Sequence, residues 1–153
     1  MSIERVKEYF KNMGIENKIM VFDVSSATVE LAAKALNCEE ARIAKTLSFH
    51  IGERVVLIVA AGDTKIDNHK YKEQFGTKAK MLAFNEVEPL IGHGVGGVCP
   101  FGVNEGVEVY LDQSLKRFDT VFPACGSSNS AVELTIKELE EYSNSLGWVD
   151  VTK

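Results

Sequence analysis

The sequence predicts an α/β (α+β) fold in which helices surround a curved, mixed and partly barrel-like β-sheet. Segments with apolar residues at helical spacing alternate along the chain with short segments that are apolar throughout or alternate in polarity. Some strands follow one another as a hairpin and others are separated by helices, so antiparallel and parallel pairs are both expected. The chain has 153 residues, a length that fits a single domain over residues 1–153.

Two helices are expected in the first part of the chain, on either side of a short extended run at residues 18–22. The second helix covers residues 28–36 and ends at Asn37, a residue that tolerates the left-handed conformation of a helix C-terminus. The first helix ends at Gly14, and its buried side is marked by Ile3, Val6, Phe10 and Met13.

The most clearly marked pair of strands comes next. The segment KTLSFHI, residues 45–51, alternates in polarity, so that Leu47 lies on an apolar face and Thr46 on the opposite face. Residues 52–54 form a turn, and residues 55–61 are apolar throughout, as expected of a central strand covered on both faces. These two segments are predicted to form a hairpin.

Helices and short strands alternate in the middle of the chain. Residues 67–75 are predicted to form a helix closed by Gly76, and a short strand is expected at residues 80–84. A capping box of Asn85 and Glu88 is expected to open the next helix, which ends where a glycine-rich loop begins.

The last third of the chain is expected to hold three strands and a helix. The strands are predicted at residues 107–111, 120–124 and 131–134. The helix begins at Thr135, and Glu138 completes its capping box. The buried stripe of this helix is expected to consist of Ile136, Leu139, Tyr142 and Leu146.

Composition and charge exclude several classes of protein. Hydrophobic residues make up 45% of the chain and charged residues 25%, which excludes a disordered, collagen-like or coiled-coil chain. No apolar run reaches the roughly 18 residues of a membrane span, and the N-terminus is not a signal peptide, so we expect a cytoplasmic protein without a membrane partner. The net charge of -5 argues against a DNA-coating basic face, although it allows contact with one nucleic-acid end.

The cysteines predict neither a disulfide framework nor a metal site. There are three of them, an odd number, and no two have the CxxC spacing of a zinc ligand pair. We therefore expect a reducing compartment, no metal and no cofactor.

The stretch GVGGVCPFG, residues 94–102, lies within a region that contains six of the 12 glycines, between residues 92 and 106. Gly92, Gly94 and Gly97 match GxGxxG, but a helix precedes them and Pro100 follows, which excludes a dinucleotide-binding turn. A glycine cluster of this kind can serve a tight connection only. Alternatively, its unobstructed N–H groups form a nest or oxyanion hole for an anionic or carbonyl oxygen.

Lys45 is a second candidate, because its place in the strand puts a charged amine on the same face as Leu47. Such a lysine either extends to solvent from the start of the strand or reaches into a cleft to hold a negative or carbonyl oxygen. The polar loop GSSNS at residues 126–130 adds hydroxyls and main-chain donors, which any hairpin loop also uses.

Three motifs occur here in a fixed order: a lysine that opens an apolar strand within AKTLSF, a GxxxP loop from Gly96 to Pro100 within GGVCPFG, and a glycine-polar loop before AVELTIKEL. In this combination the chain resembles the YbaK/ProX aminoacyl-tRNA editing family, also known as the prolyl-tRNA-synthetase-associated editing domain. The resemblance covers residues 21–142.

The resemblance implies a YbaK-like fold and a free-standing trans-editing deacylase. Such an enzyme hydrolyses the ester of mischarged tRNA, with Cys-tRNA(Pro) or Ala-tRNA(Pro) as the type of substrate. Its partner is the aminoacyl-tRNA 3′ end, and an aminoacyl-tRNA synthetase is a further candidate. The chain departs from some relatives at residues 127–128, where serines replace basic residues, and at residues 20–22, where some members carry a tyrosine.

The motifs also carry expected roles. Lys45 would anchor the 3′ nucleotide or its phosphate, while main-chain N–H groups of residues 96–99 would polarise the ester carbonyl. The expected catalytic residues are Lys45, Gly96, Gly97, Val98 and Cys99. The expected substrate-binding residues are Phe22, Thr46, Pro100, Phe101, Gly102, Gly126, Ser127 and Ser128.

Two other functions stay open on the sequence alone. A module that binds an aminoacyl or nucleotide end without cleaving it would use the same pocket. A thiol hydrolase or redox protein would use Cys99 or Cys125, although neither His50 nor His93 has a spacing that identifies it as a base.

Overall fold

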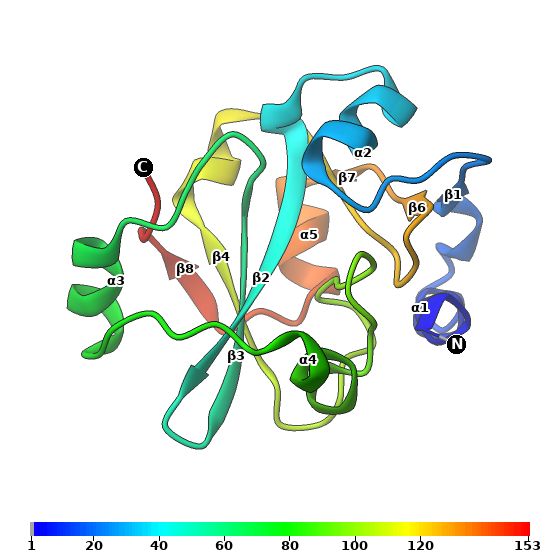
Figure 1. Ribbon diagram of the computed structural model, residues 1–153. Coiled ribbons are helices and arrows are strands. Elements are labelled where there is room, and N and C mark those ends of the chain that lie inside the picture. The colour runs from blue at the N-terminus through cyan, green and yellow to red at the C-terminus, as the bar shows by residue number, and fades with distance from the viewer. Residues whose placement is uncertain (1) are drawn as a thin grey trace.

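A curled six-stranded sheet forms the centre of the molecule (Figure 1). The computed structural model describes residues 2–153, and the strand order is β7-β5-β2-β3-β4-β8. The β2–β3 and β5–β7 pairs are antiparallel, whereas β2–β5, β3–β4 and β4–β8 are parallel. The strands are β2 (Ile43–Ile51), β3 (Arg54–Ala61), β4 (Glu108–Asp112), β5 (Thr120–Pro123), β7 (Leu134–Thr135) and β8 (Gly147–Val149). The predicted mixed, curved sheet is confirmed.

The hairpin of β2 and β3 is the longest pairing and runs from Ile51 opposite Arg54 to Ala44 opposite Ala61. Residues 56–61 of β3 have no exposed surface, which confirms the prediction of a central strand covered on both faces. Leu57 and Val59 face one apolar core, and Val56 and Ile58 face another on the opposite side of the sheet.

Helices cover both faces of this sheet (Figure 1). On one face, Tyr71 of α3 packs against Phe49, with their ring centroids 5.1 Å apart. On the other face, α1, α4 and α5 contribute Phe10, Ile91 and Leu139 to the larger core. The helices are α1 (Ser2–Lys11), α2 (Val29–Leu36), α3 (Asn68–Phe75), α4 (Phe84–Ile91) and α5 (Ile136–Tyr142). Three short 3₁₀ helices, η1 (Glu16–Lys18), η2 (Glu40–Arg42) and η3 (Gln113–Arg117), complete the described helical segments.

Several expected helix ends are confirmed. Asn37 closes α2 with a φ of 53°, and Gly76 closes α3 with a φ of 76°, both in the left-handed region. Thr135 and Glu138 form the expected capping box of α5.

Other expected elements are wrong in extent. The strand expected at residues 18–22 shrinks to β1 (Met20–Val21), which pairs with β6 (Ser130–Ala131) in a separate two-stranded sheet. The segment expected as one strand at residues 131–134 is divided between β6 and β7, because the chain passes from one sheet to the other there. The strand expected at residues 80–84 is reduced to a single bridge between Met81 and Phe49.

Two helix details also differ. Helix α4 begins at Phe84, and the Glu86 carboxylate accepts from the Ala83 N–H at 2.8 Å, so the box expected at Asn85 and Glu88 is wrong. Helix α5 ends at Tyr142, which leaves the Leu146 side chain 63% exposed instead of on the buried stripe. Strand β8 was not anticipated, because its three residues are too few to show a period.

Candidate active site

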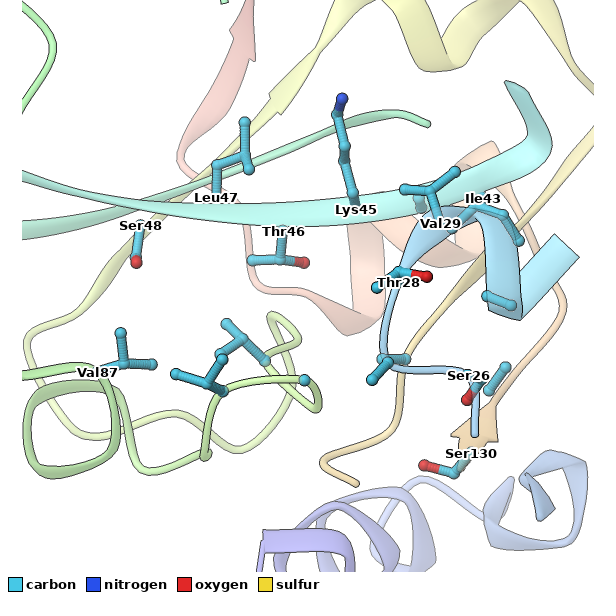
Figure 2. A pocket seen from close by; sticks show the side chains of 18 of the residues that line it. Ser26, Thr28, Val29, Ile43, Lys45, Thr46, Leu47, Ser48, Val87 and Ser130 are labelled. Atoms are coloured by element: carbon cyan, nitrogen blue, oxygen red, sulfur yellow. The ribbon is translucent and has the colours of Figure 1, made fainter. Parts of the chain in front are cut away.

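A pocket of about 360 Å³ opens beside the outer edge of β2. Figure 2 shows its lining side chains, which come from β2, from the segment before α2 and the start of that helix, and from α4 and the loop that follows it. Most of the lining is apolar, as Val29, Ile43 and Val87 illustrate. Within the part of the chain that the structure describes, Lys45 alone among the lining residues carries a charge.

The pocket exists because β2 is paired along only part of its outer edge. Strand β5 covers residues 43–44, and the segment before α4 covers the edge again where Leu82 N–H donates to Ser48 O at 3.2 Å. Between these contacts the edge faces the pocket. Since outward-directed N–H and C=O groups recur every second residue of an antiparallel strand, Thr46 directs its main-chain donor and acceptor toward the pocket.

Thr46 also brings a hydroxyl that has no partner. Its Oγ1 is buried and, within residues 2–153, makes no hydrogen bond. A buried polar atom without a partner costs about 1–3 kcal/mol, so such an atom is usually satisfied by an ordered water or by a ligand. This orphaned hydroxyl in the wall of an open pocket is the strongest local indication of a binding site.

Further hydroxyls surround the same cavity. The side chains of Ser26 and Ser48 are each 8% exposed, and Ser130 is 1% exposed. Thr28 caps α2, since its Oγ1 accepts from Leu31 N–H at 3.2 Å, and its hydroxyl hydrogen can still be donated. A mostly apolar cavity with a few hydroxyl groups is suited to a small uncharged organic group rather than to a metal or a multiply charged ligand.

Lys45 lies on the other face of β2. Figure 2 shows Lys45 and Leu47 pointing to one side of the strand and Thr46 and Ser48 to the other. The Lys45 ammonium donates to the carbonyl oxygens of Gly62, at 3.5 Å, and of Thr64. Partial burial, together with Lys65, lowers the pKa of Lys45, while Asp63 acts in the opposite direction. Contrary to expectation, the ammonium does not extend into the pocket, and its role in binding stays a prediction.

The glycine loop supplies part of the opposite wall. Gly96, with a φ of 94°, and Val98 both line the pocket. Gly97 does not, because it packs against the main chain of the 126–130 loop: a Cβ at this position would lie 2.6 Å from Ser127 N. Its N–H donates to Gly94 O at 3.1 Å, so this group is not the free donor that the sequence suggested.

Cys99 and Phe101 belong to the core. Neither has any exposed surface, and the Phe101 ring lies 4.8 Å from that of Phe10. Burial raises the pKa of Cys99 to about 12, so its thiol stays protonated at neutral pH. His93, also fully buried, donates from Nε2 to Phe101 O at 2.6 Å and therefore cannot take a proton from Cys99 at that nitrogen. This arrangement does not favour a thiol hydrolase.

The remaining expected residues lie behind the pocket or away from it. Pro100 and Gly102 line a second hollow beside α1. Phe22 N–H donates to Asn129 O at 2.8 Å, and Ser128 O accepts from Ser26 N–H at 2.6 Å, so both residues hold the loops that form the wall. Gly126 and Ser127 contact Gly97 from the far side. None of these residues lines the pocket itself.

Sequence reasoning missed Ser26, Thr28, Ser48 and Ser130. The first two lie in a turn where serine and threonine are common, and Ser130 was assigned to an ordinary polar loop. Ser48 has the same strand parity as Thr46, which is the signal that could have identified it.

Comparison with known proteins identifies the family. The family model of the aminoacyl-tRNA editing domain matches residues 23–142. The chain belongs to this editing family. The uncharacterized protein YwhH of Bacillus subtilis (strain 168) is 57% identical over 154 residues, which cover 100% of this chain and 98% of YwhH.

Two other similar proteins are more distant in sequence. A proline–tRNA ligase of Bacillus cytotoxicus is 31% identical over 101 residues, which cover 65% of this chain but 18% of the ligase. A crystal structure described as that of a candidate trans-editing enzyme for prolyl tRNA synthetase superposes with a TM-score of 0.89 at 27% identity, covering 99% of this chain and 97% of that one. These similarities confirm the fold class and the family that the motifs indicated.

No helix within residues 2–153 is both long and apolar enough to cross a membrane. Within the same residues, no three His, Cys, Asp or Glu side chains gather in a way that could hold a metal ion.

Proposed function

We propose that this protein is a trans-editing deacylase that hydrolyses the ester between a wrongly attached amino acid and the 3′ adenosine of a tRNA. The observation that carries the proposal is the unpartnered hydroxyl of Thr46 beside its outward-facing main chain, in the pocket of a chain that belongs to the editing family. A bound aminoacyl group would give this hydroxyl the partner that it lacks.

The reaction needs few groups. Water attacks the carbonyl carbon, the bond from that carbon to the ribose oxygen breaks, and the leaving oxygen takes a proton from the water. Charge develops on the carbonyl oxygen in the transition state, where a single preorganised donor contributes about 3–4 kcal/mol. The Thr46 N–H and hydroxyl on one wall and the N–H groups of Gly96 and Val98 on the other are the proposed donors.

The lining favours a small, uncharged side chain. About 360 Å³ holds an aminoacyl group together with part of its ribose. The described lining offers no partner for a charged side chain, because Lys45 directs its ammonium to the other face of β2 and the other lining residues are uncharged. Alanine and cysteine fit these walls, and the similar ligases are named for proline tRNA. We therefore propose Ala-tRNA(Pro) or Cys-tRNA(Pro) as substrate.

Lys45 is proposed to bind the terminal phosphate from the rim of β2. Its ammonium would exchange the carbonyl oxygens of Gly62 and Thr64 for a phosphate oxygen, a stronger acceptor because it is charged. Its lowered pKa reflects the burial that a phosphate would offset.

The test is incubation of the purified protein with a panel of mischarged tRNAs that carry alanine, cysteine, serine or proline. Release of alanine or cysteine at a rate proportional to enzyme concentration is the expected result. A protein that only binds the 3′ end would instead slow the spontaneous loss of the amino acid, and that result would contradict the proposal.

The same assay tests the role of Lys45. Lys45→Ala is expected to lower kcat/KM about tenfold or more through KM, because a charge-assisted contact is lost. Lys34→Ala serves as the control, since Lys34 is exposed on α2 and pairs only with Glu30 at 4.0 Å.

A further inference from the structure

Three large apolar side chains stand exposed at the mouth of the pocket. Phe84 is 80% exposed, Met81 is 56% exposed and Val95 is 53% exposed, and all three line the pocket. No ring contact or cation–π contact within residues 2–153 involves Phe84. A phenyl ring left in water at the entrance of a binding site forfeits the stability that its burial would provide, and nothing in the fold recovers it.

The segment that carries two of these side chains is held firmly. His50 N–H donates to Lys80 O at 2.8 Å, and Leu82 N–H donates to Ser48 O at 3.2 Å, so residues 80–82 are fastened to the edge of β2. Glu86 then joins the start of α4 to the same strand through His50 Nε2, at 3.1 Å. Phe84 is the first residue of α4, in a position fixed before any ligand binds.

The negative net charge of the protein indicates that uncharged contacts must contribute to binding of a nucleic-acid end. The protein has a net charge of -5, and within residues 2–153 Lys45 alone brings a charged side chain to the pocket lining, with its ammonium on the other face of β2. Each phosphate that a protein neutralises contributes a salt-dependent part of nucleic-acid affinity, and one cation provides little of it. Affinity for a polyanionic end must therefore come mainly from uncharged contacts, such as base stacking on an aromatic ring.

We propose that Phe84, flanked by Met81 and Val95, is a stacking platform for the terminal nucleobase of the substrate. The inference rests on the proposed function, because it places the 3′ nucleotide at the pocket mouth when the aminoacyl group is inside. The occupant is an aromatic base, since the ring presents a flat apolar face at the mouth of the pocket in which the proposed function places the aminoacyl group.

The test uses a short single-stranded RNA ending in CC followed by 2-aminopurine, whose fluorescence is quenched on stacking. The wild-type protein is expected to quench it. Phe84→Leu, which keeps apolar area but loses the ring, is expected to weaken binding about tenfold, and Phe84→Tyr to retain it. Leu146→Ala is the control, because Leu146 is 63% exposed and does not line the pocket.

Salt dependence separates stacking from charge. Phe84→Leu is expected to leave the slope of log K against log salt unchanged, whereas Lys45→Ala is expected to reduce it by about 0.7, the value for one phosphate of a single strand. A changed slope in Phe84→Leu would overturn the inference.

Failure of the proposed function would be recognised separately. Quenching that depends on the Phe84 ring, in a protein that cleaves no mischarged tRNA, would overturn the deacylase proposal and support the platform. Absence of quenching by the wild-type protein, or equal quenching by Phe84→Leu, would overturn the platform even if the deacylase assay succeeds. If Phe84 serves only to dock another protein, the wild-type protein and Phe84→Leu should show no difference in quenching.

Discussion

At the scale of single residues, Thr46 shows a conflict between stability and function. Its Oγ1 is buried in the wall of a cavity without a hydrogen-bond partner, at a cost of about 1–3 kcal/mol. Proteins violate such rules mainly at functional sites, where the group is held ready for a ligand. The cost that Thr46 imposes on folding is therefore evidence for its role in binding.

We expect Thr46→Val to stabilise the folded protein and, at the same time, to lower its deacylase activity. Valine replaces the unpartnered hydroxyl with a methyl group of the same shape, so the free energy of unfolding should rise by about 1 kcal/mol. Deacylation should fall by about 10²-fold or more in kcat, because one donor to the transition state is lost. Urea unfolding and single-turnover deacylation measure the two effects.

Thr152→Val is the matched control for this substitution. The Thr152 residue is buried, as is the Oγ1 atom of Thr46, but the Thr152 hydroxyl donates to Asp112 Oδ2 at 2.7 Å and lies outside the pocket lining. The Thr152→Val protein should lose about 1–3 kcal/mol of stability and should keep its deacylase activity at temperatures where it is folded. Equal destabilisation by the two substitutions would show that the Thr46 hydroxyl has a partner after all.

The polarity period of a strand predicted which face of the sheet each side chain occupies. Alternation along KTLSFHI placed Lys45 and Thr46 on opposite faces of the strand, and the structure confirms that assignment (Figure 2). It could not tell which face borders a pocket, because that depends on where β5 leaves the edge of β2. The ammonium was therefore expected in the cleft, whereas the hydroxyl of Thr46 is there.

At the scale of elements, two loops that are far apart in sequence touch through their main chains. Gly97 meets Gly126 and Ser127 so closely that a Cβ would lie 2.6–2.8 Å from their backbone atoms. The sequence indicated that the glycines permit a close approach, but the partner at Gly97 is protein rather than ligand. This contact joins the wall formed by Gly96 and Val98 to the segment that leads to Ser130.

We expect Gly97→Ala to cost about 2–4 kcal/mol of stability, because neither main chain can move without disturbing the core beneath it. Gly147→Ala should be nearly neutral, since nothing lies within 4 Å of its Cβ position. Thermal unfolding followed by circular dichroism compares the two. A Gly97→Ala protein as stable as Gly147→Ala would show that the loops are free to separate.

Elements with strong local signals were predicted well, and elements set by the tertiary fold were not. The β2–β3 hairpin and the caps of α2, α3 and α5 follow from periodicity and capping chemistry within a few residues. The division between β6 and β7 and the pairing of β8 depend on which strands lie nearby in space. No local pattern carries that information.

At the scale of the whole molecule, the site is a product of sheet curvature. Strand β5 covers only residues 43–44 of β2, and the segment before α4 covers residues 48–50, so the uncovered edge between them becomes the floor of the pocket. The mixed topology and curling were expected from the order of elements, and the position of this gap was not. Such a gap leaves the main-chain N–H and C=O groups of the strand edge open to a ligand even though no glycine is present there.

The C-terminal segment holds the opposite side of the sheet together, although it lies outside the residues that match the family model. Strand β8 pairs with β4, and Val149 and Val151 are buried in the core beside α3. The fully buried carboxylate of Asp112 accepts from Val151 N–H at 2.8 Å and from the Thr152 hydroxyl at 2.7 Å. The segment thus satisfies a buried charge as well as adding apolar contacts.

Deletion of residues 147–153 is therefore expected to unfold the protein. The two valines contribute about 1.5–3 kcal/mol each, and loss of the Asp112 partners leaves a buried carboxylate with fewer hydrogen bonds at a further cost of about 1–3 kcal/mol for each. Together these losses match most of the 5–15 kcal/mol typical of a domain, so the truncated chain should show no cooperative thermal transition. Deletion of Lys153 alone removes only its main-chain pairing with Lys65 and should shift the transition by a few degrees. A cooperative transition in the 147–153 deletion would show that β4 can end the sheet without β8.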